Sequence, residues 1–184
     1  MGSSDEFDVV VICSGNRFRS PIAEAVLRRA AEGLPVRVRS FGTMDLPPGH
    51  ALPEALELAP SYGLDLMSHR SRPLAGNDLS GADLVIGFEQ IHAAKAVVGA
   101  GAHRERTFLV TELAAALDEA ASPHGDEVVE RARAVVRQAD EARKAATGMP
   151  QEIADPIGGP AAGYGRSAAE VYRLTTRVAE RLFS

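Results

Sequence analysis

The sequence contains a single cysteine and no tryptophan, and aromatic residues make up only 5% of its 184 positions. One cysteine cannot form an internal disulfide, so a disulfide-stapled extracellular domain is excluded and a reducing, cytoplasmic location is expected. Positive charge is not in excess, with 20 Lys and Arg against 25 Asp and Glu. We therefore expect neither nucleic acid nor a membrane surface as a partner. There is also no apolar run long enough for a transmembrane helix and no amino-terminal signal pattern.

Hydrophobic residues make up 45% of the chain, enough for one core, so we expect a single domain over residues 1–184. Short apolar runs alternate with stretches of helical periodicity. The expected strands are 7–12, 36–40, 82–86 and 106–110, and the expected helices are 21–32, 53–62, 76–79, 89–98, 126–147 and 165–183. This alternation predicts a doubly wound, three-layer α/β fold, with a four-stranded parallel sheet and helices on both faces. Residues of about 119–148 interrupt the rhythm and predict a helical insertion.

The most informative stretch is 9–21, where a β-branched run ends at Cys13 and a helix is expected to begin near Pro21. A short turn from strand to helix points successive backbone N–H groups into one concavity, at the positive end of the helix, and this geometry binds phosphate-like anions. Arg19 adds a planar guanidinium that matches two phosphoryl oxygens. The same field favours the thiolate of Cys13, which is the nucleophilic form. Together these features indicate phosphoryl transfer through a cysteinyl-phosphate intermediate.

The start of the expected helix carries its own local features. We expect Ser20 to be the N-cap, Pro21 to occupy the first helical position, and Glu24 to lie in the first turn. In a parallel sheet, ligands bind beyond the carboxyl ends of the strands, and Cys13 stands at such an end.

The stretch resembles the motif of the low-molecular-weight protein tyrosine phosphatases, in which Cys, five residues and Arg are followed by Ser or Thr. Gly15-Asn16, Arg19-Ser20-Pro21 and Ala23-Glu24 all match. The resemblance implies a phosphate-binding loop made of Ser14, Gly15, Asn16, Arg17, Phe18, Arg19 and Ser20. It also implies a supporting hydrogen-bond network made of Asn16, Ser20, Ser40 and His69. Within it, we expect Asn16 to adopt a left-handed backbone, Ser20 to donate to the Cys13 sulfur, and His69 to fix the Asn16 side chain. No metal or cofactor is implied.

A cysteine phosphatase also needs a proton donor for the departing oxygen. Asp155 precedes Pro156 in a glycine-rich loop that resembles the Asp-Pro general-acid loop of the same family. Proline restricts the preceding residue to an extended backbone, which limits where the carboxyl group points. The resemblance implies that Asp155 acts as the acid in the first step and as the base for water in the second.

Three positions depart from the family pattern. Phe18 stands where many members carry a second cysteine, Ile157 where tyrosine is common, and Arg17 where an apolar residue is typical. The missing aromatic walls weaken the case for phosphotyrosine, because a phenyl ring is normally held between apolar and aromatic surfaces. We expect Arg17 to point outward; an inward side chain that recognises a second anionic group stays open.

Two other patterns are set aside. Residues 163–168 mimic a dinucleotide-binding fingerprint but follow a glycine-proline loop rather than a strand. The histidines at 50, 69, 92, 103 and 124 lack the close spacing of a metal site.

The leading hypothesis is a phosphatase, with protein phosphotyrosine as the substrate and inorganic phosphate as the product. A phosphorylated small metabolite is the first alternative. An arsenate reductase is the second, and it requires an external low-molecular-weight thiol because the chain has no further cysteine. A non-catalytic phosphate-binding module is the third, although binding alone requires neither Cys13 nor Asp155.

Overall fold

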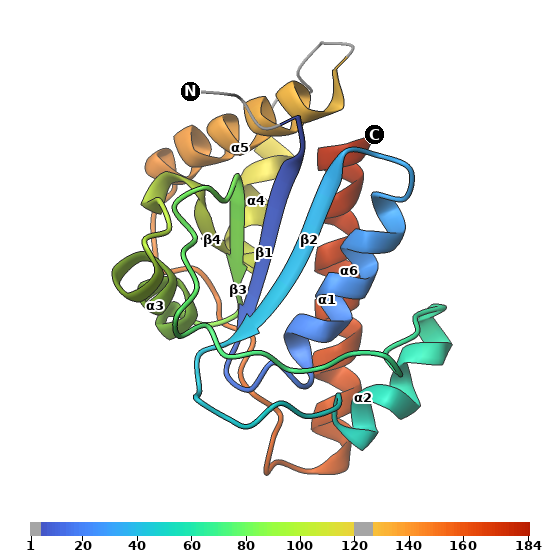
Figure 1. Ribbon diagram of the computed structural model, residues 1–184. Helices are drawn as coiled ribbons and strands as arrows, with labels where there is room; N and C mark the ends of the chain where they lie inside the picture. The colour runs from blue at the N-terminus through green and yellow to red at the C-terminus, as the bar shows by residue number, and fades with distance from the viewer. Residues whose placement is uncertain (1–4, 120–126) are drawn as a thin grey trace.

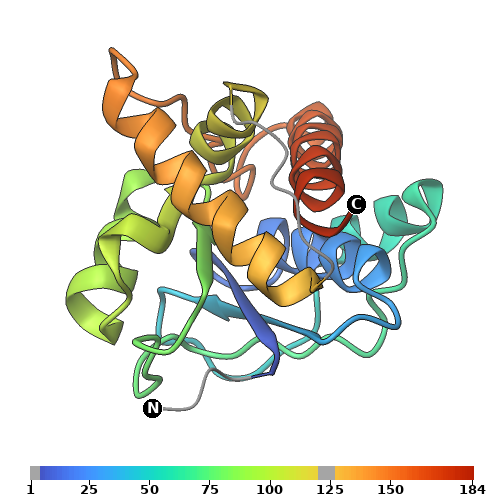
Figure 2. The same ribbon diagram turned by 90° about the horizontal axis from the view of Figure 1, so that it is seen from above.

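The computed structural model describes residues 5–119 and 127–184. The strands are β1 (Phe7–Cys13), β2 (Val36–Gly42), β3 (Leu84–Gly87) and β4 (Thr107–Leu109). The helices are α1 (Arg19–Ala30), α2 (Pro53–Leu58), α3 (Gln90–Ala100), α4 (Val110–Glu119), α5 (Val128–Ala145) and α6 (Ala161–Phe183), with 3₁₀ turns at Ala59–Tyr62 and Arg104–Arg106. Figure 1 labels the main elements, and Figure 2 shows α3 on one side of the strands and α1 and α6 on the other.

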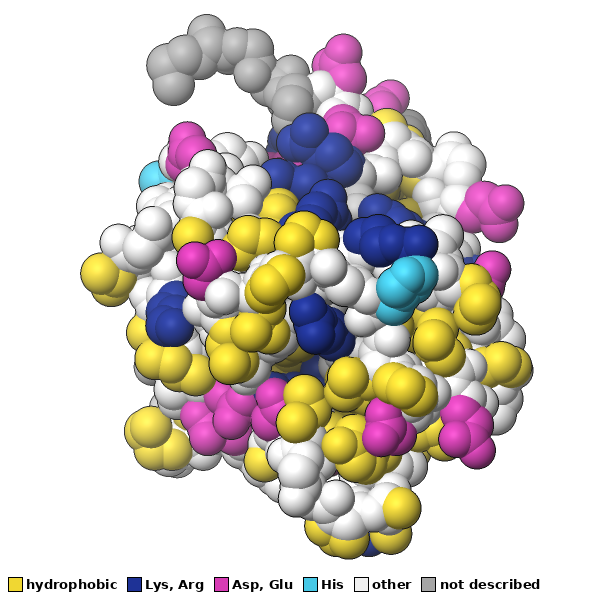
Figure 3. Space-filling model, turned by 60° about the horizontal axis from the view of Figure 1, so that its bottom comes forward, with side chains coloured by type: hydrophobic (Ala, Val, Ile, Leu, Met, Phe, Trp, Pro, Cys, Tyr) yellow, Lys and Arg dark blue, Asp and Glu magenta, His cyan; other side chains and the backbone are white. Residues whose placement is uncertain are grey.

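The four strands form one parallel sheet in the order β2-β1-β3-β4. The predicted fold class, a parallel sheet covered by helices on both faces, is therefore confirmed. Because all strands run the same way, their carboxyl ends share one edge, which lies at the bottom in Figure 1 and is brought forward in Figure 3. Cys13 is the last residue of β1 and pairs with Gly42, the last residue of β2. The fold thus delivers the predicted nucleophile to the edge where ligands bind in such sheets.

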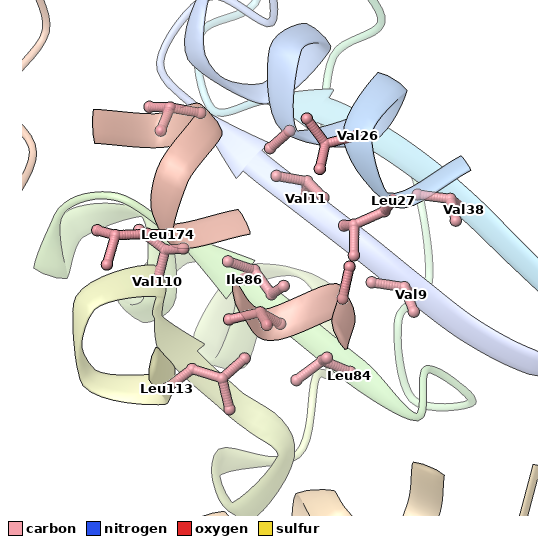
Figure 4. Close-up of a cluster of buried hydrophobic side chains, with 14 of the residues drawn as sticks. Val9, Val11, Val26, Leu27, Val38, Leu84, Ile86, Val110, Leu113 and Leu174 are labelled. Atoms are coloured by element: carbon pink, nitrogen blue, oxygen red, sulfur yellow. The ribbon is translucent and has the colours of Figure 1, made fainter. Parts of the chain in front are cut away.

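The core divides between the two faces of β1, as the alternation of side chains along a strand requires. Val9 and Val11 pack in a cluster with residues of α1, α4 and α6, and Figure 4 shows part of this cluster. Val10 and Ile12 belong to a second cluster on the opposite face, where α3 packs. Since β1 is buried on both faces, its carboxyl end and the loop that follows have little freedom to move.

The predicted insertion contains one long helix, α5, and the structure describes it from Val128 onward. The part of the prediction on residues 120–126 lies outside the described residues. The helix packs against α4, α6 and β1. Arg133 Nε binds Asp83 Oδ1 at 2.9 Å, and the Arg143 guanidinium lies 4.1 Å from the centre of the Phe108 ring. These contacts fix α5 to the body of the fold, far from the edge that carries Cys13.

The structure differs from the sequence-based element predictions at three places. Residues 110–119 form α4, which the sequence analysis did not predict, although Leu113 and Leu117 are fully buried at helical spacing. The helix predicted over 76–79 was wrong: Gly76 closes a turn with a φ of 78°, which is incompatible with a helix, and residues 77–79 are irregular. The helix expected over 53–62 divides into α2 and a 3₁₀ turn. None of the helices in the described residues has the length and apolar character of a membrane span.

Candidate active site

The turn between β1 and α1 builds the site, and its start differs from the prediction. The helix begins at Arg19, with Phe18 at the N-cap position and no side-chain cap. Pro21 is therefore the third helical residue, where its missing N–H still removes only a donor without an intrahelical partner. Glu24 lies beyond the first turn and is buried. The Ser20 hydroxyl does not cap the helix, because it is hydrogen-bonded to the Cys13 sulfur.

Cys13 is 2% exposed, and its sulfur receives two hydrogen bonds. The backbone N–H of Asn16 donates to Sγ at 3.2 Å, and Ser20 Oγ lies 3.0 Å from the same sulfur. Ser20 Oγ also accepts a hydrogen bond from Asn16 Nδ2 at 2.8 Å, and it donates to the sulfur when Cys13 is a thiolate, the form that acts as a nucleophile. Both contacts lie where negative charge on the sulfur would be stabilised by hydrogen bonds.

Asn16 connects the loop to the neighbouring strand and to the segment around residue 70. It has a φ of 54°, the left-handed conformation that Asn tolerates. Its Nδ2 also donates to Ser40 Oγ at 2.7 Å, and its Oδ1 accepts the backbone N–H of Arg72 at 2.9 Å. His69 Nε2 donates to the Asn16 backbone carbonyl at 2.8 Å. The expectation that His69 fixes the Asn16 side chain is corrected: Ser40, Ser20 and Arg72 hold that side chain, and His69 holds the backbone.

Glu24 completes this network on the side away from the thiol. Ser40 Oγ donates to Glu24 Oε2, and Arg28 Nη2 binds Glu24 Oε1 at 2.6 Å. Asn16 Nδ2 donates to Ser40 Oγ, so the Ser40 hydroxyl proton points to Glu24. Desolvation by burial lowers the pKa of His69, which favours its neutral form beside this network.

Arg19 is 1% exposed and is surrounded by acceptors. Nη1 donates to Glu89 Oε2 and to the Ile153 carbonyl, both at 2.7 Å. Nη2 donates to Asp155 Oδ2 at 2.6 Å and to Ser14 Oγ at 3.1 Å. Within the described residues, Nε–H makes no hydrogen bond. Both terminal nitrogens are thus held in place, and Nε–H remains for a ligand.

Asp155 reaches this guanidinium although 136 positions separate it from Arg19 in the sequence. The Ile153 N–H donates to the Phe88 carbonyl just after β3, at 2.9 Å, which ties the loop to the carboxyl edge of the sheet. Asp155 Oδ1 accepts the backbone N–H of Ile157 at 3.1 Å, so the second carboxyl oxygen is free to face Arg19. The structure therefore brings Cys13, Arg19 and Asp155 to one edge of the sheet.

Glu89 and His92 belong to the same cluster, and sequence reasoning missed both. Burial and the charge of Arg19 lower the pKa of His92 to about 3, so its ring is neutral near pH 7. Its Nδ1 accepts the backbone N–H groups of Phe88 and Glu89, at 3.3 and 3.1 Å, and the proton must therefore sit on Nε2. The signal that would have found Glu89 is its position just after β3, on the edge where Cys13 ends β1.

His92 and Arg19 together orient the hydroxyl of Ser14. His92 Nε2–H donates to Ser14 Oγ at 3.2 Å, and Arg19 Nη2–H donates to the same oxygen at 3.1 Å. A hydroxyl oxygen has two acceptor positions, and both are filled. Within the part of the chain that the structure describes, the Ser14 proton has no acceptor, so it is available to a ligand at Arg19.

Arg17 and Phe18 pack away from the thiol. Arg17 Nη2 donates to the Pro47 carbonyl at 2.7 Å, and Nε lies 3.4 Å from Ser71 Oγ, so the guanidinium lies over the 47–49 loop at the rim. The Phe18 ring is buried edge-on against Tyr164 of α6, at 5.3 Å between ring centres. Thus an aromatic pair supports the loop from behind, whereas Met44 and Ile157 beside it are about half exposed and aliphatic.

Gly42 sets how closely β2 approaches the phosphate loop, and this gives a testable prediction. A Cβ at Gly42 would lie 2.9 Å from both the Gly15 carbonyl carbon and the Ser14 oxygen, which are backbone atoms that cannot turn aside. We expect Gly42→Ala to displace the loop and lower kcat/KM about 10- to 100-fold, as misplacement of a catalytic group does. Steady-state hydrolysis of an aryl phosphate measures this. Gly81→Ala is the control, since no atom lies within 4 Å of its Cβ position; equal rates in the two variants would contradict the prediction.

A buried thiol with hydrogen-bond donors around it, next to an arginine in a strand-to-helix turn, defines the cysteine-dependent phosphatases. The model of the low molecular weight phosphotyrosine protein phosphatases matches residues 8–127, and this chain belongs to that family. The family resemblance inferred from the motif is confirmed, and the chain is an enzyme of the phosphatase class. The matched range ends before α5 and before Asp155.

Relatives of this chain include both tyrosine and arginine phosphatases. The protein-arginine-phosphatase of Bacillus subtilis is 36% identical over 107 residues, which are 57% of this chain and 71% of the relative. The low molecular weight protein-tyrosine-phosphatase Etp of Escherichia coli is 34% identical over 101 residues, covering 55% and 67%. Among solved structures, a YwlE mutant from B. subtilis superposes with a TM-score of 0.68 at 28% identity, covering 96% of this chain and 99% of that one. A low molecular weight protein tyrosine phosphatase from T. tengcongensis gives 0.69 at 25% identity, covering 96% and 100%.

Proposed function

We propose that this chain dephosphorylates proteins through a cysteinyl-phosphate intermediate, with Cys13, Arg19 and Asp155 as its catalytic residues. The observation that carries the proposal is the convergence of three groups from distant parts of the chain. Cys13 Sγ is hydrogen-bonded to the Asn16 N–H and to the Ser20 hydroxyl, and Arg19, which begins the helix after the same turn, is bound to Asp155 at 2.6 Å. A binding module requires neither a nucleophile nor an acid, so this arrangement favours an enzyme over that alternative.

In the first step, the Cys13 thiolate attacks phosphorus, and the bond from phosphorus to the leaving atom breaks as Asp155 gives that atom its proton. In the second, Asp155 takes a proton from water, the water oxygen attacks phosphorus, and the P–S bond breaks. Inorganic phosphate leaves, and both the thiolate and the acid are restored. The loop amides from Ser14 to Ser20 and the Arg19 guanidinium hold the equatorial oxygens throughout.

Arg19 has to exchange partners for this to happen. An incoming phosphoryl group takes Nε–H and replaces Asp155 on Nη2, since two oxygens of one phosphoryl group match that pair of donors. Asp155 is then released toward the leaving atom, where its proton is needed. Glu89 and the Ile153 carbonyl keep Nη1 in place during the exchange. The Ser14 proton, oriented by His92, gives the phosphoryl group a further donor.

The phosphorylated residue has two candidates. Phosphotyrosine is favoured by the family match. Phosphoarginine is favoured by the similarity to a protein-arginine-phosphatase, and also by the site itself. The residues at positions 44 and 157 are the aliphatic Met44 and Ile157 instead of tryptophan or tyrosine. Glu89 and Asp155 are carboxylates bound to Arg19, and each is about a quarter exposed. Carboxylates attract the cationic guanidino group that carries phosphate in phosphoarginine.

Two further parts of the proposal concern the whole chain. We treat residues 1–184 as one phosphatase domain in which about 119–148 are a helical insertion, because the family match ends at residue 127 and α5 packs on α4, α6 and β1. We place the protein in the cytoplasm, because Cys13 must remain a free thiol to react. A phosphorylated metabolite stays an alternative substrate.

The test compares three substrates: an aryl phosphate, a phosphotyrosine peptide, and a phosphoarginine peptide of the same sequence. We expect hydrolysis of the aryl phosphate and of the phosphotyrosine peptide, with release of inorganic phosphate as the readout. Activity on the phosphoarginine peptide alone assigns the second candidate, and activity on the aryl phosphate alone points to a small metabolite. Inactivity on all three, with a folded protein and a reduced thiol, contradicts the proposal and makes thiol-dependent arsenate reduction the next assay.

A further inference from the structure

Four arginines on α1, on the phosphate loop and in the segment around residue 70 contact only one carboxylate, Glu24, within the described residues. We call Arg17, Arg28, Arg70 and Arg72 the arginine rim. Arg17 donates to the Pro47 carbonyl and Arg70 to the His69 carbonyl, at 2.7 and 2.8 Å. Neither of these two contacts a carboxylate within residues 5–119 and 127–184. Backbone carbonyls orient a guanidinium but leave its charge in place.

The other two members share one carboxylate. Glu24 lies 2.6 Å from Arg28 and 3.8 Å from Arg72, and it is 4% exposed, whereas the two arginine side chains are 60% and 46% exposed. The acid is therefore buried beneath two cations that face solvent. The arginine rim carries four positive charges against one negative charge, in a chain whose net charge is −5. Figure 3 shows Lys and Arg side chains gathered in the centre and upper half of this face.

The arginine rim borders a groove of about 680 Å³ between α1 and residues 63–72. Arg70 and Arg72 line the part next to His69, which binds the Asn16 carbonyl of the phosphate loop, whereas Arg28 lies in the last turn of α1 and donates to the Val38 carbonyl. The groove also holds Arg29, while its exposed acids, Glu32 and Asp65, lie toward the far end of α1. The shape suits an extended chain segment, and the charge near the loop suits an acidic one.

The strand pairing gives the backbone distance from Cys13 to the segment that carries Arg72. Cys13 pairs with Gly42, and Gly42 forms a bridge with Pro73, the neighbour of Arg72. Two strand spacings amount to about 10 Å. An extended peptide advances about 3.3 Å per residue, so about three residues cover that distance.

We propose that the arginine rim and its groove bind an acidic segment of the phosphoprotein substrate, with Asp or Glu about three positions from the phosphorylated residue. This rests on the proposed function, because the phosphorylated residue must sit at Cys13 while its neighbours reach the arginine rim. The contacts are exposed ion pairs, so they raise the rate of capture and select among substrates more than they add affinity.

The experiment measures kcat/KM for pairs of phosphopeptides that differ only in having Glu or Gln two to four positions from the phosphorylated residue, on either side. In the unmodified protein, we expect the Glu peptide to be preferred about 3- to 10-fold at low salt, as two or three exposed ion pairs allow. The preference should fall toward 1 at 0.5 M salt. The variant Arg70→Gln/Arg72→Gln should lose it, and Arg137→Gln/Arg173→Gln, with the same charge change on exposed positions of α5 and α6, should keep it. The ratio within each variant cancels any general loss of activity.

Equal kcat/KM for the two peptides in the unmodified protein, or an equal ratio in both double variants, overturns the inference. Inactivity on every substrate is a failure of the proposed function instead. In that case, fluorescence anisotropy measures how tightly the labelled Glu and Gln peptides bind to the Cys13→Ser variant, and this result still decides the inference. Tighter binding of the Glu peptide that depends on Arg70 and Arg72 supports it, and equal binding contradicts it.

Discussion

Cys13→Ser is expected to abolish phosphatase activity, with kcat reduced at least about 10⁴-fold. A serine hydroxyl is protonated at neutral pH, and among the described residues no general base contacts this position: the groups bound to Sγ are the Asn16 N–H, which is a donor, and the neutral hydroxyl of Ser20. The measurement is the rate of phosphate release from an aryl phosphate, at pH 7 and under reducing conditions.

The substitution also has an expected positive result. Serine is smaller than cysteine and fits in the same place, so the loop should keep its form and the variant should still bind inorganic phosphate through the loop amides and Arg19. Titration calorimetry with phosphate checks this, and Arg19→Ala is the variant that should lose binding. Substantial turnover by Cys13→Ser would contradict a cysteinyl-phosphate mechanism, and loss of phosphate binding would mean that the loop had not folded.

Asp155→Asn is expected to lower kcat about 10²- to 10³-fold, the usual contribution of a general acid. The amide retains the size of the carboxyl group, but it has no proton to give to the leaving atom and cannot act as a base for water. The loss should depend on the leaving group: large for a poorly acidic phenol, and small for a phenol that departs readily as its anion. A series of aryl phosphates measured at constant pH gives this dependence.

The leaving-group series separates the acid role from a purely structural one. Asp155 also neutralises Arg19, so a structural defect would lower kcat by the same factor for every aryl phosphate. An equal loss across the series would therefore contradict the acid role. Asp45→Asn is the matched control, because Asp45 is exposed on the loop after β2 and lies outside this cluster of contacts.

The fold could be predicted from the sequence because its local patterns agree with one another. β1 is a continuous β-branched run, and it is buried on both faces as such runs are in parallel sheets. α4 was missed because its apolar positions follow β4 without any intervening loop, so strand and helix read as one apolar segment. The expected helix over 76–79 was wrong because four residues ending in a turn cannot be distinguished from a helix by periodicity.

The site, like the fold, has features that the sequence predicts and features that it does not show. The sequence places Cys13, Asn16, Arg19 and Ser20 on one short turn, where spacing alone brings them together. It does not show that the Ser20 hydroxyl serves the thiol instead of the helix terminus, since both uses suit the same residue. Nor does it show that His69 holds a backbone carbonyl, or that Arg17 lies on the 47–49 loop. Each of these depends on which acceptor lies within about 3 Å.

By itself, the sequence determined which chemistry to expect: a cysteine nucleophile and a phosphate-binding arginine, with five residues between them, at the end of a buried strand. That information is local, because a strand-to-helix turn has few conformations and each residue in it has one place. Only the tertiary structure showed that Glu89 and His92, at the start of α3, join the site and that Asp155, implied by the family resemblance, contacts Arg19. What brings them together is the parallel sheet, which gathers the carboxyl ends of its strands at one edge, and no spacing in the sequence records that edge.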